Sequence, residues 1–186
     1  NHDSFALEAS KGGIPQGLLW KKYITDHRGA RYTREMGRYY DRLPYVALSK
    51  DFLACHASPP SRRVDLDMLI NAARHKGLTR QLIHNRVRQP RYPGGYTPKD
   101  VKRFRKALGL GPKFPFIVGH NPLTEDETLW LNAGDIENHH IVFSAKPNVV
   151  GVFTRIDDRI TPLVYNTEPV LDMINALSDR QERHTI

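Results

Sequence analysis

Two histidines follow short apolar runs of a kind that forms buried strands. His56 follows residues 52–55, and His120 follows residues 116–118 and a single glycine. Short apolar runs bounded by turn residues are typical of strands covered on both faces. Ligands of open α/β sheets bind beyond the carboxyl ends of such strands. A lone strand-end histidine is more often an ordinary loop residue, but two of the same design predict a shared metal site if their strands are neighbours.

Three short motifs occur in a set order along the chain: Asn1-His2-Asp3, Cys55-His56-Ala57 and Gly119-His120-Asn121-Pro122. They resemble the last three metal-site motifs of the calcineurin-like metallophosphoesterases. Those motifs read Gly-Asn-His-Asp/Glu, then a strand-end histidine with small neighbours, then Gly-His-Thr-Pro. Residues 142–153 resemble the Phe-Ser-Ala-Pro-Asn-Tyr-x-Gly-x-Phe segment of the phosphoprotein phosphatase branch, with Lys146 inserted and Val149 replacing the tyrosine. The resemblance extends from residue 1 to about residue 165.

The resemblance implies a role for each residue of these motifs. Asn1, His56 and His120 would bind the second of two divalent metal ions, and Mn, Fe or Zn suit an amide oxygen and two imidazoles better than Mg or Ca does. His2 would be the general acid that protonates the leaving oxygen, and Asp3 would hold the His2 ring and keep it cationic.

A substrate-binding arginine is also implied. Residues 82–88 resemble the segment that supplies a phosphate-gripping arginine in the phosphatase branch, with His84 in place of a tryptophan. A guanidinium fork matches two phosphate oxygens. Arg86 is the expected residue, and Arg88 is the alternative.

The implied protein is a hydrolase of phosphate monoesters whose substrate is a phosphorylated protein or small molecule. We expect an α/β fold, with residues 1–186 forming a single domain: the family's β sandwich flanked by helices, without its N-terminal strands. The family's first two motifs precede the Gly-Asn-His motif, and this chain begins at Asn1. It would therefore lack the ligands of the first metal, and we expect weak metal binding and no useful turnover from these residues alone.

Charge leaves two other functions open. The chain carries a net charge of +8, and residues 74–106 hold eleven Lys or Arg residues against one Asp. Such a region attracts polyanions. It would suit a phosphodiesterase or a nucleotide or dinucleoside polyphosphate hydrolase on the same fold. It would equally suit a non-catalytic domain that binds nucleic acid or a protein partner.

Composition sets broader bounds. The chain has 186 residues, of which 39% are hydrophobic and 26% charged, as in a globular protein. No apolar run approaches the roughly 20 residues of a membrane helix, so no membrane partner is expected. Cys55 is the only cysteine, which excludes a disulfide within the chain and fits a cytoplasmic setting.

Helices and short strands must position these side chains. The apolar spacing and the turn residues predict helices over residues 31–42, 64–75, 78–83, 98–109 and 169–177. Strands are predicted over residues 45–48, 52–55, 116–118, 128–132, 140–144, 149–156 and 159–165. We expect the first two strands to form a hairpin and those after His120 to be antiparallel. Gly77 is expected to end the helix over residues 64–75.

Overall fold

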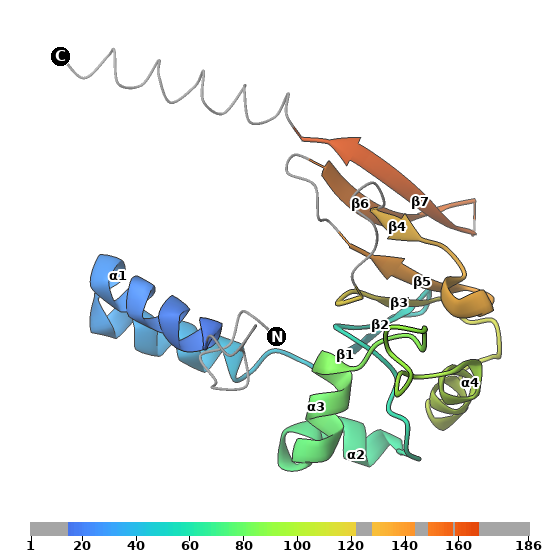
Figure 1. The fold of residues 1–186 in the computed structure, drawn as a ribbon, viewed down its shortest axis with the longest axis horizontal. Coiled ribbons are helices and arrows are strands. Elements are labelled where there is room, and N and C mark those ends of the chain that lie inside the picture. The colour runs from blue at the N-terminus through green and yellow to red at the C-terminus, as the bar shows by residue number, and fades with distance from the viewer. Residues whose placement is uncertain (1–14, 122–127, 144–148, 158, 168–186) are drawn as a thin grey trace. The chain divides into compact units, whose positions relative to one another are not determined.

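A computed structural model gives the fold of the chain and describes residues 15–121, 128–143, 149–157 and 159–167 (Figure 1). The chain divides into two compact units, Asn1–Tyr45 and Val46–Ile186. The described part of the first unit contains one kinked helix, and that of the second contains a mixed sheet with helices and a β-hairpin. The predicted α/β class is therefore confirmed.

The first unit is built on α1 (Gln16–Tyr40), which turns sharply at Gly29. Gly29 has a φ of 82°, a left-handed conformation that glycine adopts without strain. Across the turn, the hydroxyls of Thr25 and Thr33 lie 3.1 Å apart, and Trp20 Nε1 donates to the Tyr40 hydroxyl at 3.2 Å. The sequence predicted only the second half of α1, because the turn interrupts the helical period of the apolar residues.

The second unit contains a five-stranded sheet in the order β1-β2-β3-β5-β4. The outer pairs β1–β2 and β4–β5 are antiparallel, whereas β2–β3 and β3–β5 are parallel. The expected hairpin is confirmed as β1–β2, and the antiparallel pairing expected among the strands after His120 is confirmed for β4–β5. β5 also pairs in parallel with β3, which precedes His120. The strands are β1 (Val46–Leu48), β2 (Leu53–Cys55), β3 (Phe116–Val118), β4 (Leu129–Trp130) and β5 (His139–Val142).

Helices form between β2 and β3, namely α2 (Leu66–Ile70), the 3-10 turn η1 (Ala72–Arg74), α3 (Lys76–His84) and α4 (Pro98–Ala107). A second 3-10 turn, η2 (Ala133–Asp135), precedes β5. The predicted start of α4 is confirmed, since Thr97 and Asp100 form a capping box in front of its first turn. Its predicted end is also confirmed, because Gly109 follows α4 with a φ of 70°.

The predicted helix over residues 64–75 is wrong in its extent. It is interrupted at Asn71, whose backbone leaves the helical region and whose side chain donates to the Asp67 carbonyl at 3.1 Å. Side-chain bonds of this kind compete with helical ones. Gly77, which was expected to end this helix, lies inside α3.

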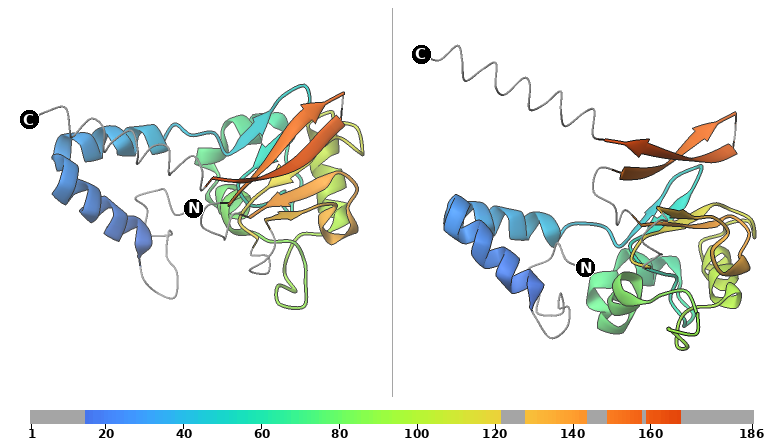
Figure 2. Two further views of the ribbon diagram at one scale, coloured as in Figure 1. Left: turned by 90° about the horizontal axis from the view of Figure 1, so that it is seen from above. Right: turned by 45° about the horizontal axis from the view of Figure 1, so that its top comes forward.

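The two faces of the sheet are covered differently (Figures 1 and 2). On one face, the Phe104 ring of α4 lies 5.7 Å from that of Phe116 in β3. On the other lies the antiparallel hairpin of β6 (Val149–Ile156) and β7 (Arg159–Asn166), predicted over almost the same residues. There the Phe153 ring stacks on His140 of β5 at 5.2 Å. The helix predicted over residues 169–177 lies outside the described residues.

Candidate functional site

The two strand-end histidines meet. β2 and β3 pair in parallel with Cys55 opposite Val118, so their carboxyl ends lie side by side. The backbone N–H of Gly119 donates to the His56 carbonyl at 2.8 Å, which joins the segments that follow the strands. His56 Nε2 and His120 Nδ1 are 3.2 Å apart, within hydrogen-bonding distance. The sheet therefore brings together two residues separated by 64 positions.

A tight turn presents His120. Its φ is 60°, in the left-handed region where histidine is found more often than most residues. The N–H of Asn121 donates to the Gly119 carbonyl at 2.7 Å, which closes the turn over His120. A Cβ on Gly119 would lie 3.3 Å from the His56 carbonyl oxygen, so the absent side chain allows the close approach of the two segments.

The His120 ring is kept neutral. Burial lowers its pKa, and the neighbouring His56, Arg86 and His84 lower it further, to about 3. Metal binding by histidine requires a neutral ring with a free lone pair, because a proton and a metal compete for the same nitrogen. The His120 ring is therefore neutral at pH 7, which is the form in which an imidazole can bind a metal ion.

Arg86 lies on the segment that follows α3. The charge of Arg86 acts on His120, and its guanidinium lies 4.5 Å from the centre of the Tyr92 ring. The alternative residue, Arg88, is exposed, and its Nε donates to the Gly95 carbonyl at 3.3 Å. Of the two arginines, Arg86 is thus the one with an interaction that connects it to the histidine pair.

A third histidine lies beside the pair. The ring of His84, at the end of α3, is 6.0 Å from that of His120, in an edge-to-face arrangement. From the sequence, His84 is recognised only as a replacement for a tryptophan in residues 82–88. Its place at the site depends on the packing of α3 beside the loop after β2, which is fixed by a bond from the Ala57 N–H to the Leu82 carbonyl.

A buried polar network lies behind these residues, and sequence reasoning missed it. The Tyr96 hydroxyl is 2.8 Å from His139 Nε2, and both residues are at most 1% exposed. His139 Nδ1 lies 3.1 Å from the Phe116 carbonyl, which can only accept, so Nδ1 carries the proton and Nε2 accepts from Tyr96. The side chain of Asn121 accepts from the Val87 N–H at 2.7 Å.

The remaining predicted residues, Asn1, His2 and Asp3, lie outside the described residues. Within the part of the chain that the structure describes, no three His, Cys, Asp or Glu side chains form a group that could hold a metal ion. His56 and His120 are thus the two predicted ligands that can be located. Cys55 is buried next to the site, where its thiol donates to the Ser58 carbonyl at 3.3 Å.

The sequence matches no known protein-family model and no curated protein. Among the described helices, none combines the length and the apolar character needed to cross a membrane.

Proposed function

We propose that this chain forms part of a metal-dependent phosphoesterase site that hydrolyses phosphate monoesters. The observation that carries the proposal is the 3.2 Å separation of His56 Nε2 and His120 Nδ1 at the ends of two parallel strands. In the same proposal the chain is one domain of the calcineurin-like metallophosphoesterase class. The packing of Phe153 on His140 supports a sandwich, because it joins the β6–β7 hairpin to the sheet.

The donor pair fits a metal ion. Two imidazole nitrogens that each lie about 2.1 Å from one ion are separated by about 3.0 to 3.4 Å at ordinary ligand angles. The observed 3.2 Å falls in this range, and His120 is neutral. His56 and His120 would hold the ion, with Asn1 as a third ligand. A metal ion held there would polarise the phosphoryl group and lower the pKa of a water molecule.

Residues of the chain itself would bind the phosphate group and supply a proton to the leaving oxygen. Arg86 would bind two phosphate oxygens through its guanidinium, which the contact with the Tyr92 ring orients. His2 would give a proton to the leaving oxygen, and Asp3 would orient the His2 ring.

Cobalt binding tests this proposal, because Co²⁺ ligated by imidazole has a visible spectrum. Adding Co²⁺ to the chain should produce bands that decrease with His56→Ala and with His120→Ala, each with about a tenfold or greater loss of affinity. His27→Ala is the matched control, since His27 is an exposed histidine of α1. Equal Co²⁺ affinity in all four proteins would refute the proposed site.

The substrate class needs a separate measurement. Because no useful turnover is expected from these residues alone, the assay compares Mn²⁺-dependent binding of a phosphopeptide, bis(p-nitrophenyl) phosphate and a dinucleoside polyphosphate to the chain. Preference for the phosphopeptide supports the monoesterase. Preference for either of the other two would assign a phosphodiesterase or a nucleotide hydrolase on the same fold.

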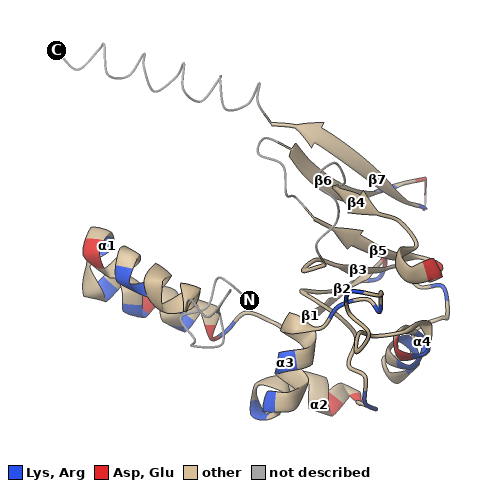
Figure 3. Ribbon diagram, viewed as in Figure 1, with Lys and Arg blue, Asp and Glu red and all other residues tan. Residues whose placement is uncertain are grey.

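A second candidate function rests on α4. Its exposed Lys99, Lys102 and Lys106 recur at the spacing of one helix face, and Figure 3 shows Lys and Arg along this helix. Arg105 does not belong to this surface, because it is only 2% exposed and donates to the Pro112, Glu137 and Asn138 carbonyls. A non-catalytic domain that binds nucleic acid would use this basic face.

Salt dependence distinguishes the two functions. Binding of a single-stranded oligonucleotide should weaken steeply with salt, and replacing the three α4 lysines by Gln should reduce the slope of log K against log salt by about 2. Such binding would be unaffected by chelator and by His56→Ala. Removing three cations from the exposed surface of α1 controls for net charge (Lys21, Arg34 and Arg38). An equal loss in this control would exclude a specific role for α4.

A further inference from the structure

The histidine turn and the arginine segment are joined through one side chain. Asn121 directly follows His120, and its Oδ1 accepts from the Val87 N–H, next to Arg86, at 2.7 Å. Its Nδ2 donates to the Gly119 carbonyl at 2.9 Å. Asn121 is only 3% exposed, so water does not compete for these bonds. Its amide therefore holds the turn of His120 against the backbone of the Arg86 segment.

Tyr96 holds the same segment from its other side. The Tyr96 N–H donates to the Arg86 carbonyl at 2.8 Å, and the Arg88 N–H donates to the Tyr96 carbonyl at 2.9 Å. A Cβ on the preceding Gly95 would lie 2.4 Å from the Arg86 carbonyl oxygen, so this approach requires glycine. The backbone around Arg86 is thus enclosed between the tight loop before Tyr96 and the Asn121 amide.

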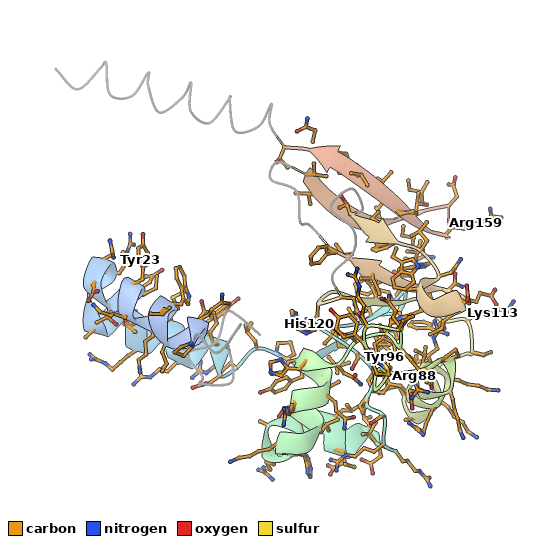
Figure 4. All side chains as sticks on the ribbon, viewed as in Figure 1. Tyr23, Arg88, Tyr96, Lys113, His120 and Arg159 are labelled. Atoms are coloured by element: carbon orange, nitrogen blue, oxygen red, sulfur yellow. The ribbon has the colours of Figure 1, made fainter. Side chains whose placement is uncertain are left out.

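The side chain of Tyr96 connects this backbone to the sheet. Its hydroxyl donates to His139 Nε2, and His139 is fixed in turn by the Phe116 carbonyl of β3. Burial raises the pKa of the Tyr96 hydroxyl, nearby Cys55 raises it further, and a hydrogen bond with the Asn121 side chain lowers it. Figure 4 labels Tyr96, Arg88 and His120 among the side chains of the second unit.

We propose that Asn121, Tyr96 and His139 are positioning residues, which set the spacing between His120 and the guanidinium of Arg86. The inference rests on the proposed function, since it gives these two residues the tasks of holding metal and phosphate. None of the three positioning residues is assigned contact with the substrate. They act by fixing two groups from distant parts of the chain in one geometry.

Three variants and a control test the inference on the full 186-residue chain. Tyr96→Phe removes the hydroxyl and Asn121→Ala removes the amide. The double variant Tyr96→Phe/His139→Leu removes both partners of the buried bond, which avoids leaving either one unsatisfied. Tyr165→Phe removes a hydroxyl from an exposed residue of β7 and is the control.

Two readouts separate positioning from stability. Tungstate affinity in the presence of Mn²⁺ should decrease about tenfold in Tyr96→Phe and in Asn121→Ala. When either variant is combined with Arg86→Ala, the losses of tungstate affinity should not add. The reason is that Tyr96, Asn121 and Arg86 all act on one contact, that between the Arg86 guanidinium and tungstate. In the metal-free chain, NMR resonances of the Arg86 Nε–H and the His120 ring should shift. The urea midpoint of the double variant should return to the wild-type value. Its tungstate affinity and its Arg86 and His120 resonances should not.

Other outcomes would overturn the inference or the proposed function. If the single variants lower the urea midpoint while the Arg86 and His120 resonances stay unchanged, the network only stabilises the core and the inference is wrong. Recovery of all three properties in the double variant would also overturn it. If the wild-type chain binds no tungstate, the proposed function fails, and the metal-free resonances still decide whether the network positions these residues.

Discussion

His139 gives the clearest stability prediction, because it is buried without a charge. It is 0% exposed, and burial lowers its pKa to about 3, with Arg105 and His140 contributing in the same direction and the bond to the Phe116 carbonyl opposing them. In the unfolded chain the imidazole has its ordinary pKa of 6.5. Below pH 6.5 His139 binds a proton in the unfolded chain but stays neutral in the folded chain. The stabilisation is therefore complete above about pH 6.5 and is lost as the pH falls towards 3.

The size of the effect follows from the two pKa values. A pH of 5 is 1.5 units below the pKa of 6.5 that the imidazole has in the unfolded chain. The unfolded imidazole is therefore almost fully protonated at pH 5, whereas the folded one is neutral. At 1.36 kcal/mol per unit, the free energy of unfolding falls by about 2 kcal/mol between pH 7 and pH 5 because of this residue.

Urea unfolding at pH 7 and pH 5 measures this directly. The wild-type chain should lose about 2 kcal/mol more between the two pH values than Tyr96→Phe/His139→Leu, which has no imidazole at this position. His120, whose pKa is also lowered to about 3, is present in both proteins and cancels. Tyr96→Phe alone should keep the wild-type pH dependence. Parallel losses in wild type and double variant would refute the conclusion that His139 is held neutral.

Three further predictions concern the surroundings of the site. Gly95→Ala should lower the free energy of unfolding, measured in urea, by about 3 kcal/mol, because the added Cβ would meet the Arg86 carbonyl. Gly94→Ala is the control and should change this free energy by less than about 1 kcal/mol, because nothing lies within 4 Å of its Cβ position. Similar values for the two variants would argue against the tight loop. Asp100→Ala should cost about 1 to 2 kcal/mol in the same assay, because it removes the carboxylate that accepts from the N–H and the hydroxyl of Thr97, the N-cap of α4, and an unchanged midpoint would contradict the capping box. Burial raises the pKa of the Cys55 thiol to about 12, so an aromatic disulfide reagent at pH 8 should modify Cys55 only in denaturant, and rapid reaction of the folded protein would contradict this.

Local signals in the sequence were sufficient for much of the secondary structure. Thr97 and Pro98 mark the start of α4 because capping and a fixed proline φ act within a few residues. The short apolar runs of β2 and β3 could be identified in the same way, and they led to the pair of His56 and His120.

The rest depends on contacts between distant parts of the chain. Nothing near His139 in the sequence indicates that its partner is Tyr96, 43 positions earlier, or that β5 pairs in parallel with β3. His84 reaches the site only because α3 packs beside the loop after β2. Gly77 would end an isolated helix, but here the backbone bonds from Leu78 and Thr79 to the His75 carbonyl start a new one around it.

The parallel pairing of β2 with β3 has a consequence for altering this protein. The two imidazoles are aligned by strand registry and not by the 64 positions of chain that separate them. Loops within that interval could be lengthened or exchanged without separating the rings, provided that Cys55 stays opposite Val118. A slip of one position would displace one ring by roughly 3.3 Å and invert the side chains of its strand. An optical or magnetic probe of the His56–His120 distance would therefore report on sheet alignment, even in a variant with no catalytic activity.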